Sequence, residues 1–154
     1  MTKNLSASLA GLALLFAAGC GGGDGGSNKT LSYSDFSKKA NAICQKAEDD
    51  NKALGQSTTQ EATPENGQLI GKLVNIVEKQ RDDLEALKAP DRLEAAQDEF
   101  VSITNQQVDI AKEAQTAANE QDQKGYENAV KRLQALSGSA NAAGSKLGAE
   151  ACSR

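Results

Sequence analysis

Small apolar residues recur at spacings of three and four in four stretches of this chain, and this helical periodicity restricts the fold more than any other feature. The stretches run from about Ser34 to Leu54, from Pro64 to just before Pro90, from Asp91 to Asn119 and from Lys124 to Ala149. Strand-type alternation is never sustained, and with 3 Phe, 2 Tyr and no Trp the chain has few aromatic residues for a sheet. The sequence therefore predicts an all-α fold with a core of Leu, Ile, Val and Ala.

Local signals indicate where these helices begin and end. Ser34 can cap the first helix, and Thr63 is a natural N-cap for the second. Pro64 then falls at the first helical position, where its missing N–H costs nothing. Pro90 ends the second helix, because the residue before a proline disfavours helical backbone.

The third and fourth stretches keep a seven-residue repeat, which is typical of helices that share one packed stripe along their length. Short joins place consecutive helices side by side and antiparallel. We therefore expect an antiparallel up-down-up-down four-helix bundle; a splayed three-helix hairpin with the first helix folded across it is the alternative. The expected stripes are Leu93, Ala96, Phe100, Ile103, Gln107, Ile110, Ala114 and Ala117 in the third helix, and Tyr126, Ala129, Leu133, Leu136, Ala140, Ala143 and Leu147 in the fourth.

Three glycines interrupt the fourth stretch: Gly138, Gly144 and Gly148. Each costs about 1 kcal/mol relative to alanine inside a helix. We expect close backbone approach to the first helix to offset this cost, and a frayed carboxyl end is the alternative.

The amino terminus has the composition of an export signal. Lys3 precedes an apolar run from about Leu9 to Ala18, which at about 10 residues is too short for a span that needs about 20. Glycine and serine then dominate. The chain is thus expected to divide into a signal peptide (1–19), a flexible tether (20–31) and a helical domain (32–154).

The stretch "FAAGC", residues 16–20, resembles the lipobox of bacterial lipoprotein precursors. This resemblance implies that Ala17, Ala18 and Gly19 are recognition positions and that Cys20 is acylated and becomes the first residue. It also implies a protein anchored by lipid to the outer face of the cell membrane, or to a periplasmic leaflet where the cell has two membranes. Ala17 stands where such motifs usually have Leu, so cleavage by an ordinary signal peptidase is the alternative.

The chain has 3 cysteines, an odd number for an exported protein. If Cys20 carries lipid, Cys44 and Cys152 are left as a pair that can form a disulfide in an oxidising compartment. Such a bond would close a loop of about 108 residues and contribute up to about 4.7 kcal/mol in the chain-entropy model. A redox role is the alternative, but no C-x-x-C pair supports it.

Two further segments, "DFSKKANAIC" (35–44) and "AAGSKLGAEAC" (142–152), resemble the terminal motifs of small exported bacterial helical lipoproteins. The resemblance implies an extracytoplasmic location, a helical fold and the Cys44–Cys152 bond. It implies no activity and no catalytic residue.

Composition removes several kinds of chemistry. The net charge of −4 and the lack of a basic patch argue against a nucleic-acid partner. The absence of histidine excludes catalytic triads and His-based zinc sites. The acidic runs 48–50 and 81–85 lack the spacing of a calcium loop, so we expect solvated faces, no metal and no cofactor. Gln107 is expected to fix register or lie at the rim; lining a ligand cavity is the alternative.

These features favour a binding or structural module of the cell envelope over an enzyme. Its partner would be the membrane, through the lipid, together with an envelope protein or polymer. The alternatives are an envelope hydrolase that uses carboxylate, Ser or Lys chemistry, for which no catalytic residue can be assigned, and a bundle that binds a small ligand.

Overall fold

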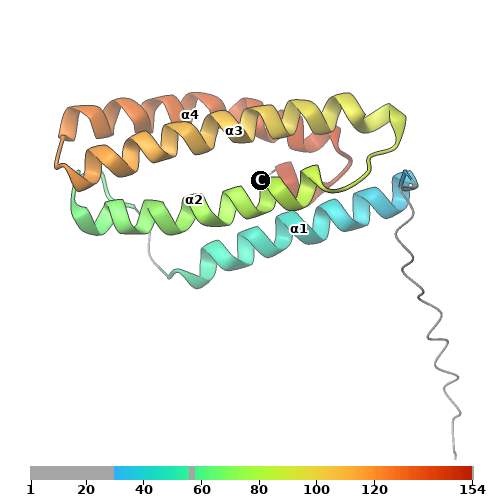
Figure 1. Ribbon diagram of the computed structural model, residues 1–154, viewed down its shortest axis with the longest axis horizontal. Coiled ribbons are helices and arrows are strands. Elements are labelled where there is room, and N and C mark those ends of the chain that lie inside the picture. The colour runs from blue at the N-terminus through green and yellow to red at the C-terminus, as the bar shows by residue number, and fades with distance from the viewer. Residues whose placement is uncertain (1–29, 56–57, 154) are drawn as a thin grey trace, which may run out of the picture.

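A computed structural model describes residues 30–55 and 58–153 of the chain. This part contains the helices α1 (Tyr33–Ala53), α2 (Pro64–Glu85), α3 (Asp91–Asn119) and α4 (Gln123–Lys146), then the short 3₁₀ helix η1 (Glu150–Ser153), and no strand (Figure 1). The predicted all-α class is confirmed. The predicted signal peptide, and the tether up to residue 29, lie outside the described residues.

Side-chain caps set the helix starts close to the predicted positions. Ser32, rather than Ser34, caps α1 by accepting a hydrogen bond from the Asp35 amide at 3.1 Å. Thr63 caps α2 ahead of Pro64, as the sequence predicts. The fourth helix ends at Lys146 instead of Ala149, because Gly148 adopts a φ of 66° that turns the chain into η1.

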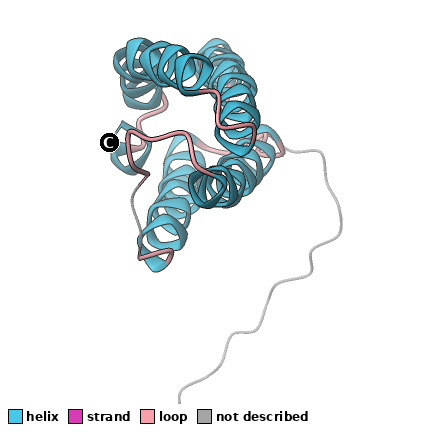
Figure 2. Ribbon diagram, turned by 90° about the vertical axis from the view of Figure 1, so that its left-hand side faces the viewer, coloured by secondary structure: helices cyan, strands magenta, loops and turns pink. Residues whose placement is uncertain are grey.

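The helices pack in chain order. α2 lies along α3 and α3 along α4, while α1 packs on α2 and on η1. Within the described residues, no Cα atom of α4 comes within 8 Å of one in α1 or α2. The view along the bundle in Figure 2 shows the open space that this leaves between the helices.

Short segments join the helices across this space at the two ends of the bundle. At one end, η1 packs against both α4 and α1. At the other, Gln123 on α4 accepts a hydrogen bond from the Ala62 amide at 2.8 Å, and Tyr126 Oη donates one to the Thr59 carbonyl at 2.7 Å. We call the end with the start of α1 and the α2–α3 connection the proximal pole, and the end with the α1–α2 connection and the α3–α4 turn the distal pole (Figure 1).

The core is divided in the same way. One buried cluster, at the proximal pole, is built from α1, the end of α2, the start of α3, the end of α4 and η1. It contains Phe36, Leu84, Phe100 and Leu147. The second, at the distal pole, contains no residue of α1 and includes Ile70, Val108, Ala114 and Tyr126.

Asn66 at the start of α2 is a buried polar residue with 5% of its surface exposed. Its side chain accepts from the Thr59 amide at 3.1 Å and donates to Thr59 Oγ1 and to the Glu61 carbonyl, each at 2.6 Å. One amide thus fixes the α1–α2 connection on the distal pole.

Asn66→Ala is therefore expected to lower the free energy of unfolding by about 2 kcal/mol, since backbone groups of Thr59 and Glu61 lose their partner. Urea unfolding followed by far-UV circular dichroism measures this loss. The matched control is Asn128→Ala on the exposed face of α4. Equal stability of the two variants would contradict the clamp.

Candidate functional site

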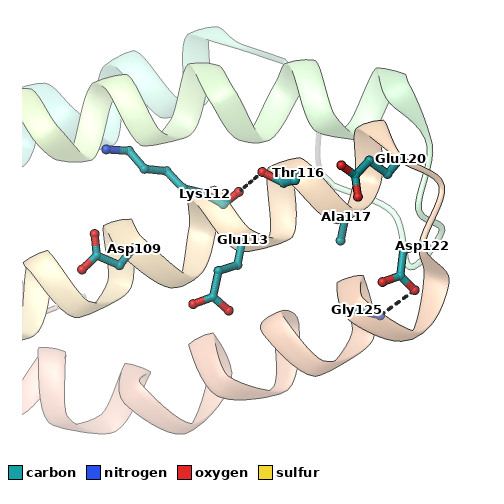
Figure 3. Close-up of a pocket in the computed structure, with 8 residues that line it drawn as sticks. All are labelled: Asp109, Lys112, Glu113, Thr116, Ala117, Glu120, Asp122 and Gly125. Atoms are coloured by element: carbon teal, nitrogen blue, oxygen red, sulfur yellow. Dashed lines mark hydrogen bonds between the residues drawn. The ribbon is translucent and has the colours of Figure 1, made fainter.

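An open hollow of about 500 Å³ lies between the end of α3 and the start of α4, at the distal pole (Figure 3). Most of its lining is charged or polar, and the side chains come from two helices and the turn between them. The lining residues are Asp109, Lys112, Glu113, Thr116, Ala117, Glu120, Asp122 and Gly125.

Three of these charged side chains already hold the helices together. Asp122 caps α4 by accepting a hydrogen bond from the Gly125 amide at 3.0 Å. Glu113 pairs with Arg132 of α4, and Lys112 Nζ lies 2.7 Å from Glu78 Oε1 of α2. Their charges are thus committed mainly to packing.

Asp109 and Glu120 are the remaining carboxylates of the hollow, and both are exposed. They lie on the same helix, about 16 Å apart along its axis at 1.5 Å per residue. Glycosidase-type acid catalysis needs two carboxyl groups within about 5 to 9.5 Å. The hollow therefore suits polar binding better than carboxylate-pair chemistry.

A second open hollow of about 500 Å³ lies on the other side of α4, beside the α1–α2 connection. Tyr126 forms part of its wall, and burial raises the pKa of this phenol. The phenol therefore stays neutral near pH 7 and serves as the hydrogen-bond donor to Thr59 described above. The lining is Thr58, Thr59, Gln60, Tyr126, Glu127, Val130, Lys131 and Gln134.

The acidic runs 48–50 and 81–85 take part in ion pairs on the helix surfaces. Lys46 pairs with Asp50 and Lys79 with Asp83, both at 2.8 Å. The hydrogen bond from Lys79 to Asp83 raises the pKa of the lysine. No group of three or more Cys, Asp or Glu side chains that could hold a metal ion occurs in residues 30–55 and 58–153.

Gln107 is half-buried on α3 and lines neither hollow. The buried polar residue of this helix is instead Thr104, whose hydroxyl donates to the Phe100 carbonyl at 2.8 Å. A local hydrogen bond of this kind lets a hydroxyl enter an apolar seam without an unsatisfied group.

Cys44 and Cys152 are joined by a disulfide, with Cα atoms 5.2 Å apart, as the cysteine count predicts. The bond is buried in the proximal cluster and links the middle of α1 to η1. Gln80 Nε2 of α2 lies 3.1 Å from Cys44 Sγ. The other predicted site residues, Ala17, Ala18, Gly19 and Cys20, lie outside the described part of the chain.

The distal hollows had no signal in the sequence. Asp122 and Glu113 look like ordinary surface charges until the packing of α3 against α4 brings them to one groove.

A scan against protein-family models finds no match, and neither does a search of the curated proteins or of the solved structures. None of the helices in the described residues is long and apolar enough to cross a membrane.

Proposed function

We propose that this chain is an exported lipoprotein whose helical domain serves as a binding or structural module in the cell envelope. One observation carries the proposal: the disulfide uses Cys44 and Cys152, so that Cys20 is the one cysteine left over. Cys20 stands directly after an apolar run and small residues, where an acylated cysteine is needed. Disulfides persist mainly outside the cytoplasm, which supports export.

In this proposal Cys20 carries the lipid, residues 20–31 form the tether, and the domain is an antiparallel up-down-up-down bundle. Each buried methylene contributes about 0.8 kcal/mol, so two or three acyl chains anchor a protein durably whereas one does not. The domain would then meet an envelope protein or polymer through its polar surface. We assign it no catalytic residue and no cofactor.

Cys20→Ser is expected to abolish incorporation of labelled fatty acid, because the proposed acylated thiol is removed. Helical content should stay unchanged, since residue 20 precedes the helical domain. Labelling of the expressed full-length chain, followed by gel analysis, measures the effect. The control is the Cys44→Ser/Cys152→Ser double variant, which should still be labelled. Retained label on the Cys20→Ser chain would overturn the anchor.

Binding is tested by photocrosslinking in cells, with the crosslinker placed at exposed Glu120 beside the hollow between α3 and α4. We expect a discrete crosslinked product that is absent when the crosslinker stands at exposed Lys72 on α2. Identical products from both positions, or none from either, would count against a binding surface at the distal pole.

A further inference from the structure

The chain reaches the bundle at a fixed point on the proximal pole. Leu31 is half-buried against the proximal cluster, and its amide donates to the Lys88 carbonyl of the α2–α3 connection at 3.0 Å. The amino-terminal segment therefore arrives at one defined end of the molecule and not along its side.

An aromatic and basic surface surrounds this point. Tyr33 is 42% exposed, and no other large hydrophobic side chain of the described residues is exposed. The guanidinium of Arg92 lies 3.9 Å from the centroid of its ring. A tyrosine of this kind has an apolar ring with a polar tip, which suits the boundary between water and lipid headgroups.

Basic side chains near this point are not used in ion pairs. Lys38, Lys39, Lys88 and Arg92 are exposed and form no salt bridge in the described part of the chain, whereas Lys46, Lys52, Lys79, Arg81, Lys112, Arg132 and Lys146 do. Carboxylates are also present here, with Asp35, Asp91 and Glu94 in the first turns of α1 and α3.

The distal pole has a different charge balance. Its exposed side chains include five carboxylates (Glu61, Glu65, Glu120, Asp122 and Glu127) and two lysines without an ion pair (Lys124 and Lys131). An anionic surface would therefore repel this pole more strongly than the proximal one.

We propose that the proximal pole contacts anionic phospholipid headgroups, with Tyr33 and Arg92 at the contact and Lys38, Lys39 and Lys88 around it. This inference rests on the proposed anchor at Cys20. A Gly-rich segment from Cys20 to Leu31 spans roughly 18 Å on average. Since α3, with 29 residues, is about 44 Å long, only the proximal pole is held close to the bilayer. Such tethering gives a weak contact a high effective concentration.

The orientation of the domain on a bilayer can be measured with a single tryptophan, because the natural chain has none. The chain from Cys20 is coupled through the Cys20 thiol, with the disulfide intact, to a maleimide lipid in vesicles that contain brominated phosphatidylcholine. Tyr33→Trp reports from the proximal pole, and Asn128→Trp on exposed α4 is the matched distal reporter. Bromine quenches tryptophan only near contact.

We expect Trp quenching at position 33 to exceed that at position 128 several-fold, and to increase when phosphatidylglycerol is included. Tryptophan is the best partner for a cation over its ring, so the Tyr33→Trp change keeps the Arg92 stack. Equal quenching at both positions on fully coupled protein would overturn the proposal.

Charge reversal separates lipid contact from simple proximity. Lys38→Glu/Lys88→Glu, in the Tyr33→Trp chain, should weaken the phosphatidylglycerol-dependent contact by roughly fivefold for each lysine. Lys124→Glu/Lys131→Glu changes the net charge equally at the distal pole and should leave that contact nearly unchanged. Equal effects of both pairs would contradict a contact specific to the proximal pole. Because the coupling is chemical, these results do not depend on whether cells acylate Cys20, which the labelling experiment decides separately.

Discussion

Reduction of the Cys44–Cys152 disulfide, or its replacement by two serines, is expected to lower the free energy of unfolding by about 4 kcal/mol. The two cysteines are 108 residues apart, so the bond removes much of the freedom of the unfolded chain. The effect is large relative to the 5–15 kcal/mol that is typical of single domains. Urea unfolding of the oxidised and reduced protein, followed by circular dichroism, measures the difference.

The loss should be concentrated at the proximal pole. The bond holds η1 to α1 within the proximal cluster, while the distal cluster contains no residue of α1. Hydrogen exchange should therefore show α1 and η1 losing protection while the starts of α2 and α4 keep most of theirs. Cys20→Ser is the control and should leave both measurements unchanged. An unchanged unfolding midpoint with both thiols shown to be free would refute this role for the bond.

Helix positions were predictable because they depend on local signals. Thr63 and Pro64 start α2, and α3 runs from Asp91 to Asn119 as the pattern indicates. The end of α4 was wrong by three residues, because the fate of Gly148 depends on where the chain must go next. Its positive φ turns η1 back toward α1, and Cys152 reaches Cys44.

The buried faces were harder to predict than the helices. On α3 the seven-residue stripe places Ile103 and Gln107 in the core, whereas Thr104 and Val108 are the fully buried residues. A straight helix drifts about 20° per heptad against a repeat of 3.5, which moves the buried face. On α4 the predicted core residues Leu133 and Leu136 are only partly buried. No element in the described residues replaces α1 as a neighbour over that part of α4.

Prediction of the sites follows the same division. Cysteine pairing could be inferred by counting, because a thiol has few partners and the structure brings this pair together. The polar hollows could not, because Glu113 and Arg132 meet only when α3 and α4 adopt one rotation about their axes. Surface charges at helical spacing fit many such rotations equally well.

Gly144→Ala is expected to lower the free energy of unfolding by about 3 kcal/mol, beyond the roughly 1 kcal/mol that alanine contributes to a helix. A β-carbon at this buried position would overlap the carbonyl oxygen of Cys152 in η1. The obstacle is backbone, not the end of a flexible side chain, so η1 must move. The predicted close approach therefore exists at Gly144, but its partner is η1 and not the first helix.

Gly138→Ala is the matched control, since a β-carbon there meets nothing within 4 Å. It should stabilise the protein by about 0.5–1 kcal/mol through helix propensity alone. Comparable unfolding midpoints for the two alanine variants would contradict the packing of η1 on α4. The cost of Gly144→Ala should also shrink after reduction of the disulfide, because η1 is then free to move away from α4. A double-mutant cycle that combines Gly144→Ala with the Cys44→Ser/Cys152→Ser pair measures this coupling, and strict additivity would show that the bond does not hold η1 against α4.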